Sequence, residues 1–479
     1  MPAFRPVVYI GGLLVLVLAA AMAIPMLVEL ALGSISAVEY LPCIGVPAFL
    51  GLSAVLATRG PPLKLGLREA YLLTAGLWFL LPLVAALPFM WAAPHLSPTD
   101  AYFEAVSGLT ATGGTVLLRL AELPPGILLW RSMLQWVGGI GIVMMAVAVL
   151  PLLKVGGMQL MSRESSDTSD KILARPRDLA TWLLTVYFSL TALAAVAYGF
   201  AGMGGFDAVN HAMTTVSTAG FSTRDTSLAG FSPAVHWVSI VFMLAGAVPF
   251  LLYVRLLRGT SGFVPWSQIP VMLAVVAGGG GLLALAALQA GHGIVDAIRH
   301  GLFTVTSIIT TTGFMSYDWQ DWGPVATSLV LMLTFCGGCT GSTTGGIKIF
   351  RWQVLAGRFR IVTQELIHPH RVVAQVYQGR PVGSEVVQSV MAFVLLVGAV
   401  TALTTLALAA TGVDLVTAVS SAATSVANVG PALGGIAGPA GTFAPLPDAA
   451  KWILSIAMLL GRLELLTVLV MLDPDFWRR

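Results

Sequence analysis

The stretch TSIITTTGF, from Thr306 to Phe314, is rich in hydroxyl groups, carries no charge and ends in Gly-Phe. It lies between two long apolar segments, at about 268–290 and 324–346. Each segment has about the 20 residues that a helix needs to cross a bilayer. Taken alone, the polar stretch is consistent with small side chains packed between helices. Related stretches elsewhere in the chain change this interpretation.

Composition places the whole chain in a membrane. Of its 479 residues 57% are hydrophobic and 10% are charged, with a mean hydropathy of +0.88. Soluble domains contain about a quarter charged residues, so we predict a polytopic protein in a lipid bilayer. The net charge of +3 and the dispersed basic residues do not indicate nucleic-acid binding. Three cysteines, Cys43, Cys336 and Cys339, are too few and too apolar in setting for a disulfide framework.

Ten apolar stretches are long enough to span a bilayer. They cover residues 7–31, 38–58, 69–91, 126–153, 179–202, 232–257, 268–290, 324–346, 384–411 and 446–472. The first resembles a signal peptide, because Arg5 precedes it and Ala21–Ala23 resembles a cleavage site. The apolar run continues to about Leu32, which favours a retained helix.

The connections between the spans alternate in charge. Most of the 25 Lys and Arg residues lie at the two termini or after the second, fourth, sixth and eighth spans. Basic connections face the cytoplasm by the positive-inside rule. Ten spans then place both termini in the cytoplasm, which agrees with their basic residues.

The other connections each contain a short semi-apolar segment that is too short to cross the bilayer. The segments begin at Asp100, Asp207, Asp296 and Asp414 and stop at Gly113, Gly220, Gly313 and Gly430. The pattern of span, half-helix, glycine loop and span therefore occurs four times. Half-helices at membrane depth line a cavity or are buried in protein, so four around one axis predict a pore.

The fold class expected is an all-α membrane protein with ten transmembrane helices. It comprises an extra N-terminal helix pair and four helix–pore-helix–helix repeats around one central pore. The predicted units are the pair at 1–68, repeat 1 at 69–154, a cytoplasmic loop at 155–178, repeat 2 at 179–258, repeat 3 at 259–350, a second cytoplasmic loop at 351–383 and repeat 4 at 384–479.

Aspartate at the start of each segment predicts a helix cap, because its carboxylate accepts backbone N–H bonds and complements the helix dipole. The spacing from Asp to Gly is 13, 13, 17 and 16 residues. We therefore expect the third and fourth half-helices to begin about one turn earlier than the first two.

Alignment on the four glycines exposes a shared pattern. Six residues before each glycine stands a hydroxyl, in Ser107, Thr214, Ser307 and Thr424. The candidate ion-lining residues are Thr110, Ala111, Thr112 and Gly113; Ser217, Thr218, Ala219 and Gly220; Thr310, Thr311, Thr312 and Gly313; and Ala427, Asn428, Val429 and Gly430. None is charged. Backbone carbonyls of such loops can replace the hydration shell of a monovalent cation, and glycine allows the positive φ that this path needs. Helix–helix packing is the alternative.

At this point the chain resembles the potassium-translocating membrane subunit of the Trk/Ktr/HKT superfamily, and most closely the bacterial Trk type. The resemblance rests on the four loops, GGCTGSTTGGIKIFR (Gly337–Arg351), GGMQL (Gly156–Leu160) and LGRLELLTVLVML (Leu460–Leu472). It implies K⁺ as the transported ion, bound by the carbonyls of the filter loops. It also implies a homodimer in the bacterial inner membrane and a cytoplasmic ring of Rossmann-type regulatory subunits that bind nucleotides. The fourth loop departs from the family pattern, because Asn428–Pro431 lacks the Thr-rich sequence.

A glycine-rich interruption in the eighth span is the first gate candidate. Its residues are Gly337, Gly338, Cys339, Thr340, Gly341, Ser342, Thr343, Thr344, Gly345 and Gly346. Five glycines in ten residues disfavour an α-helix, and non-helical backbone at this depth faces a cavity. The family resemblance implies an intramembrane loop that obstructs the pore. A Gly-rich packing face is the alternative, and a metal site at Cys336–Cys339 is disfavoured for lack of a second ligand pair.

Charged residues supply the other gate candidates. Arg462 lies mid-span, where a charge is costly and usually functional. We expect it to face the pore, repel cations and donate to carbonyls of the 337–346 segment, whereas Glu464 points elsewhere on the helix. Lys348 begins a basic segment, 348–380, which is either a solvated face or a docking surface for the regulatory ring, with 154–177 as a second contact.

The sequence therefore predicts potassium uptake driven by the membrane potential, without catalytic chemistry. A Na⁺- or H⁺-coupled symporter remains an alternative. A membrane-embedded enzyme would need paired acids or a His–acid pair within the spans, and the seven His residues are scattered. A sensor that has lost transport is a third class, against which the four intact loops argue. Asp318 and Asp321 are expected to attract cations to the outer mouth.

Overall fold

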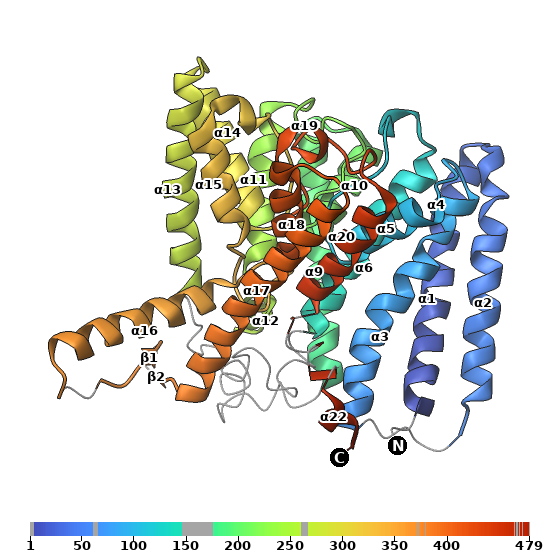
Figure 1. The fold of residues 1–479 in the computed structure, drawn as a ribbon. Coiled ribbons are helices and arrows are strands. Elements are labelled where there is room, and N and C mark those ends of the chain that lie inside the picture. Colours follow the sequence, from blue (N-terminus) through green and yellow to red (C-terminus); the bar gives the residue numbers. More distant parts are fainter. Residues whose placement is uncertain are drawn as a thin grey trace.

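The computed structural model describes residues 4–60, 66–145, 176–259, 267–370, 373–378 and 380–463, together with 465, 468, 470–471 and 473–478. The predicted segment at 156–160 and Glu464 lie outside these residues. Helices make up most of the described chain, and the long ones run roughly side by side (Figure 1). The predicted all-helical class is confirmed.

Seven described helices are long and apolar enough to cross a bilayer. They are α1 (Phe4–Ala31), α2 (Tyr40–Ala57), α3 (Leu67–Ala85) with α4 (Leu87–Trp91), α6 (Pro125–Met144), α9 (Pro176–Phe200), α13 (Gln268–Gln289) and α17 (Ser384–Ala410). Helices α11 (Pro233–Ala247) and α12 (Phe250–Arg258) add an eighth if they count as one broken span. The remaining two expected spans are shorter: α15 ends at Thr334 and α20 covers Asp448–Arg462.

The predicted span at 232–257 is broken in the middle, because α11 and α12 meet at an angle of 87°. Pro249 lies at the break and lacks the N–H that a continuous helix requires. The freed backbone groups find partners in the glycine-rich segment. Ala247 O accepts from Cys339 N at 3.0 Å, and Phe250 N donates to Gly341 O at 3.0 Å. The break between α11 and α12 and the glycine-rich segment, far apart in the sequence, are therefore joined by backbone hydrogen bonds.

The N-terminal pair packs on one side of the bundle, where α1 contacts α2, α3 and α6 (Figure 1). Glu29 of α1 is fully buried, and its Oε1 accepts a hydrogen bond from Gly126 N at the start of α6. The first helix is therefore packed against the described bundle through α2, α3 and α6.

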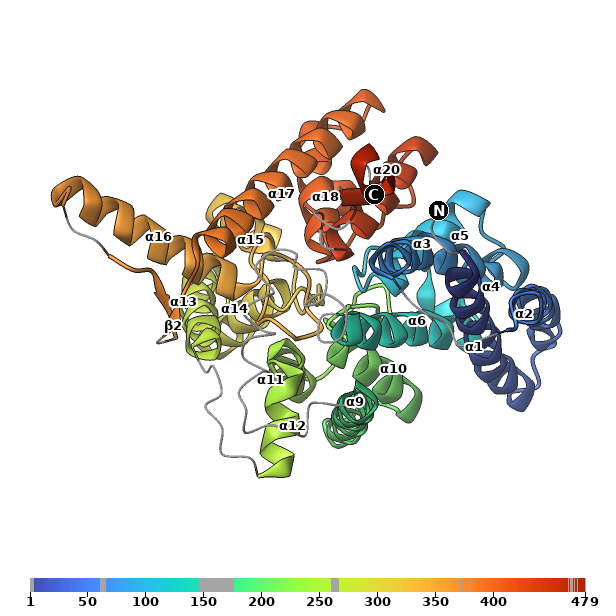
Figure 2. The same cartoon turned by 90° about the horizontal axis from the view of Figure 1, so that it is seen from below.

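Four shorter helices stand between the spans: α5 (Pro98–Leu109), α10 (Gly205–Val216), α14 (Ile294–Ile309) and α18 (Leu415–Ala427). Seen from below, the four groups of helices follow one another in chain order around a common centre (Figure 2). Only α14 is longer at its start by about a turn, so the expectation of an earlier start is wrong for α18.

The predicted aspartate caps are correct only for Asp414, whose carboxylate accepts from Thr417 N at 3.0 Å. The cap positions of the other three are Ser97, Gly204 and Gly293. The other carboxylates lie in the first turn and form ion pairs instead: Asp100 with Lys451, Asp207 with Arg224 and Asp296 with Arg299. These charged partners compete with the backbone for the carboxylate oxygens.

Helix α16 (Ile349–Ile367) projects sideways from the bundle (Figure 1), and a two-stranded hairpin, β1 (Val376–Tyr377) with β2 (Arg380–Pro381), follows it. The strands are antiparallel, with Val376 opposite Pro381. Short elements complete the described chain: η1 (Ile35–Ala37), η2 (Leu120–Glu122), η5 (Trp319–Trp322), α19 (Gly434–Ala437) and α22 (Pro474–Arg478).

Candidate functional site

The four short helices end in the same backbone motif. In each, the residue one before the glycine donates to the carbonyl six before it, as Thr312 N does to Ser307 O at 2.8 Å. The residue two before the glycine is left-handed: Ala111, Thr218, Thr311 and Asn428 have φ between 50° and 55°. These bonds define a Schellman motif. The fourth loop therefore keeps the shared backbone path although its sequence departs from the Thr-rich pattern.

Three of these left-handed residues are strained. Ala and Thr rarely adopt positive φ, and a β-branched residue there is a genuine outlier. Asn tolerates it best, which gives a physical reason for Asn428 in the fourth loop. Strained backbone persists only where surrounding structure enforces it, and it concentrates at functional sites. The four loops therefore share one strained backbone conformation, which is typical of a functional site.

The loops close into a ring through their glycines. Each glycine Cα faces the carbonyl oxygen of the next loop so closely that an added Cβ would overlap it. The distances from that Cβ position are 2.4 Å for Gly113 to Ala219 O, 1.8 Å for Gly220 to Thr312 O, 2.1 Å for Gly313 to Val429 O and 2.7 Å for Gly430 to Thr112 O. The order runs from loop one to two, three, four and back to one. Only glycine permits this approach, and its positive φ of 79–108° is also costly for other residues.

A second set of glycines, which the sequence reasoning missed, supports the ring from behind. Gly138, Gly246 and Gly461 each stand thirteen residues after the start of their helix. Each lies against a carbonyl in the last turn of the preceding half-helix, with Cβ positions 1.9, 2.9 and 2.1 Å from Leu109 O, Val216 O and Val426 O. The sequence signal that could have identified them is the constant spacing of thirteen residues between the first residue of each helix and its glycine.

The third repeat breaks this rule in an informative way. Gly337 has the same offset from the start of α15, but the helix has already ended at Thr334. Its Cβ position meets Gly345 O at 2.2 Å, a carbonyl of the glycine-rich segment itself. The predicted interruption of the eighth span is thus confirmed as non-helical backbone. The segment folds back on itself, with Gly337 N donating to Ile347 O at 2.9 Å.

The segment 337–346 contacts the strained residues of the ring directly. Gly345 N donates to Thr311 Oγ1 at 2.7 Å, and Thr218 Oγ1 donates to Thr343 Oγ1 at 3.0 Å. Thr343 Oγ1 also lies 3.0 Å from Gly246 O at the helix break. The left-handed backbone therefore aims two threonine hydroxyls at this segment.

Two basic side chains hold the segment from other directions. Arg462 is 3% exposed, and its Nη1 donates to Thr343 O at 3.1 Å. The expected donation from Arg462 to a carbonyl of 337–346 is therefore present. Lys348 Nζ donates to Thr344 O and, at 2.7 Å, to Thr344 Oγ1. Two basic groups thus bond to neighbouring residues of the segment, Thr343 and Thr344.

The basic segment 348–380 needs a correction at its start. Arg351 is fully buried, with its guanidinium carbon 3.7 Å from the centroid of the Phe393 ring in α17. Lys348 is 9% exposed. Neither residue is a solvated charge or a free docking contact, because both are buried: Arg351 packs against α17, and Lys348 bonds to Thr344. Arg358 and Arg360 lie further along α16 and are more exposed.

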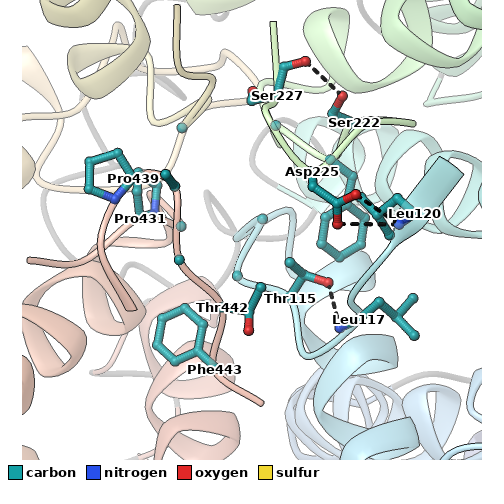
Figure 3. Close-up of a pocket in the computed structure, with 18 of the residues that line it drawn as sticks. Thr115, Leu117, Leu120, Ser222, Asp225, Ser227, Pro431, Pro439, Thr442 and Phe443 are labelled. Atoms are coloured by element: carbon teal, nitrogen blue, oxygen red, sulfur yellow. Dashed lines mark hydrogen bonds between the residues drawn. The ribbon is translucent and has the colours of Figure 1, made fainter. Parts of the chain in front are cut away.

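A cavity of about 140 Å³ opens on the other side of the ring (Figure 3). All four ring glycines line it, together with residues that follow Gly113, Gly220 and Gly430. Its wall carries Asp225, whose carboxylate accepts from Leu120 N at 3.1 Å. Asp318 and Asp321 are not among the lining residues: Asp318 caps η5 by accepting from Gln320 N. The expectation that they attract cations to the outer mouth stays a prediction.

A buried ion pair beside this cavity was also missed. Arg131 and Glu104 are at most 1% exposed, and Arg131 Nε lies 2.7 Å from Glu104 Oε1. Glu104 also accepts from Val116 N at 3.0 Å, beyond Gly113 in the first loop. Arg131 is a charge within the predicted span 126–153, and an intramembrane charge is a functional signal that could have identified it.

Comparison with known proteins decides the family. A cation transport protein model, TrkH, matches residues 48–269 and 284–477. The chain belongs to the TrkH family of cation transport proteins. Among its relatives, the Trk system potassium uptake protein TrkI of Halomonas elongata is 42% identical over 99% of this chain and 97% of its own length. TrkH of Escherichia coli K12 is 36% identical over 99% of both chains.

A solved structure of the family agrees with the fold. The crystal structure of the potassium transporter TrkH from Vibrio parahaemolyticus superposes with a TM-score of 0.91, at 35% identity and with 100% of both chains covered. The resemblance to the Trk family is therefore confirmed over the whole length. The relatives are named as transport proteins and not as enzymes, which supports the prediction that this TrkH-family chain is not an enzyme.

Proposed function

We propose that this TrkH-family protein carries K⁺ into the bacterial cytoplasm across the inner membrane, through the ring of four glycine loops. The observation that carries the proposal is the closed cycle of contacts in which each glycine abuts a carbonyl of the next loop. Such a ring presents oxygen ligands to a dehydrated monovalent cation. The carboxyl ends of four half-helices converge on it and add partial negative charge. The transported K⁺ is the substrate, and no bound cofactor is needed.

The segment 337–346 serves as the gate in this proposal. Its bonds to Thr311 and Thr218 of the ring place uncharged backbone next to the ring, and Arg462 adds a positive charge that opposes cations. Opening requires the segment to leave these partners. Because they include the ring's own threonines, gate movement and ring geometry are coupled.

Regulation and assembly follow from the family resemblance. We infer a homodimer with one pore in each subunit and both termini in the cytoplasm. We also infer a cytoplasmic ring of Rossmann-type subunits that bind the nucleotide. Arg360 of α16 is exposed and is our candidate docking contact, whereas Lys348 and Arg351 are buried.

Flux through purified protein tests the proposal. Proteoliposomes that contain the protein should take up ⁸⁶Rb⁺ in response to an inside-negative potential, which supplies about 2.3 kcal/mol per charge per 100 mV. Uptake that needs no Na⁺ or pH gradient supports a channel. Uptake that requires a co-ion gradient supports the symporter alternative, and no uptake of Rb⁺ or K⁺ under either condition contradicts the proposal.

A further inference from the structure

Helix α6 of the first repeat presents two polar side chains, one turn apart, to the second loop. Gln135 is fully buried, and Arg131 is 1% exposed. Arg131 Nη1 donates to Ser222 O at 2.9 Å, and its guanidinium carbon lies 4.1 Å from the centroid of the Phe221 ring. A helix of one repeat therefore holds the loop of the next.

The amide of Gln135 brackets Gly220. Its Nε2 donates to Ala219 O at 2.7 Å, and its Oε1 accepts from Phe221 N at 2.9 Å. A buried amide is costly unless both of its ends are paired, and here both pair with the residues on either side of one ring glycine. The side chain thus fixes the peptide groups on both sides of Gly220.

This arrangement acts on an atom of the ring itself. Ala219 O is the carbonyl that Gly113 of the first loop abuts. A carbonyl oxygen has two lone pairs, so a bond from Gln135 leaves it able to face a cation while restricting its position. The ring junction between loops one and two is therefore held by a side chain as well as by backbone contact.

Among the residues that the structure describes, the other three loops have no such amide. The residues at the same offset from the helix start are Met243, Thr334 and Met458. Met243 has no amide, and Thr334 uses its hydroxyl on Val330 O within its own helix. In the described chain, the side-chain hydrogen bond to a ring carbonyl therefore comes from α6 and not from the equivalent positions of α11, α15 and α20. The four ring carbonyls consequently differ in their hydrogen-bond partners.

We propose that Gln135 is a positioning residue that sets the selectivity of the ring for K⁺ over Na⁺ by fixing Ala219 O. This inference rests on the proposed function. A smaller cation needs its ligands to move inward, and a carbonyl tethered from behind resists that movement. Release of Ala219 O lets the ring adapt to Na⁺, so discrimination falls while conduction persists.

The test measures relative permeability in planar bilayers, from the reversal potential under opposed K⁺ and Na⁺. Gln135→Met keeps an unbranched side chain of similar length but removes the donor and the acceptor. We expect the permeability of Na⁺ relative to K⁺ to rise about tenfold, which corresponds to roughly 1.4 kcal/mol. The matched control is Met243→Leu, a buried change at the same offset in α11, which should leave the ratio unchanged.

A second variant and a second measurement guard against misfolding. Gln135→Leu should give the same shift as Gln135→Met. The melting temperature of the detergent-purified protein should rise more in KCl than in NaCl, and this difference should shrink in both variants. An unchanged permeability ratio and an unchanged KCl–NaCl difference in melting temperature overturn the inference. Absence of K⁺ current in the unmodified protein contradicts the proposed function instead, so the two failures are distinguishable.

Discussion

Alanine at the four ring glycines should impair K⁺ flux in an order that the structure sets. At Gly220 the added Cβ would lie 1.8 Å from Thr312 O, whereas contacts of real Cβ atoms are essentially never shorter than 3.0 Å. The carbonyl must therefore move by about 1.2 Å, which exceeds the roughly 0.5 Å within which functional groups must be held. The required movements shrink from Gly220 through Gly313 and Gly113 to Gly430, whose Cβ position is 2.7 Å from Thr112 O.

Backbone strain alone must be separated from this overlap. Gly291 and Gly412 have φ of 93° and 89°, close to those of the ring glycines, but no atom lies within 4 Å of their Cβ positions. Alanine at either position has only the conformational cost of a left-handed backbone, about 1–2 kcal/mol. It should lower the stability of the protein without changing the flux per folded molecule.

The assay is ⁸⁶Rb⁺ uptake into proteoliposomes, normalised to the amount of non-aggregated protein recovered by size-exclusion chromatography. We expect Gly220→Ala to reduce uptake about a hundredfold, Gly430→Ala to reduce it least, and Gly291→Ala and Gly412→Ala to match the unmodified protein. Normal uptake by Gly220→Ala, or equal losses in the ring and control variants, would refute the reasoning.

Three further predictions concern the gate and one helix cap. Arg462→Ala removes a charged hydrogen bond to Thr343 O, about 1.5–3 kcal/mol, so basal liposome flux should rise about tenfold or more; unchanged flux contradicts the gate role. Thr311→Val removes the acceptor of Gly345 N, about 1 kcal/mol, and should raise basal flux several-fold, whereas Thr363→Val on α16 should not. Asp414→Ala should cost about 1 kcal/mol of stability, measured by thermal unfolding. The Thr417 backbone N–H holds the pKa of Asp414 below its ordinary value, so this difference should vanish as the pH falls through that folded-state pKa.

The four loops were readable from the sequence because their signals are local. Each polar stretch interrupts an apolar pattern, and the glycines at 113, 220, 313 and 430 stand at the same topological place. The same reasoning found the interruption at 337–346, since five glycines in ten residues oppose a helix. An intramembrane arginine at 462 suggested its carbonyl partner, because a buried charge needs one.

Features that depend on tertiary partners were not readable. The left-handed conformation of Thr218 and Thr311 opposes their own preference, and their hydroxyl contacts to the 337–346 segment come from a distant repeat. The bend at Pro249 is stable because Cys339 and Gly341 satisfy the open backbone. Arg351 looked solvated in a basic segment, whereas the ring of Phe393, far along the chain, buries it.

The central claim is that one cation pathway passes through the ring of four loops. The most direct measurement is a crystal structure of the protein grown in RbCl, with data collected at the rubidium absorption edge. The account predicts anomalous density on the ring axis, within coordination distance of the carbonyl oxygens of Thr112, Ala219, Thr312 and Val429. Rubidium density elsewhere in the membrane-spanning region, with none at the ring, would contradict it.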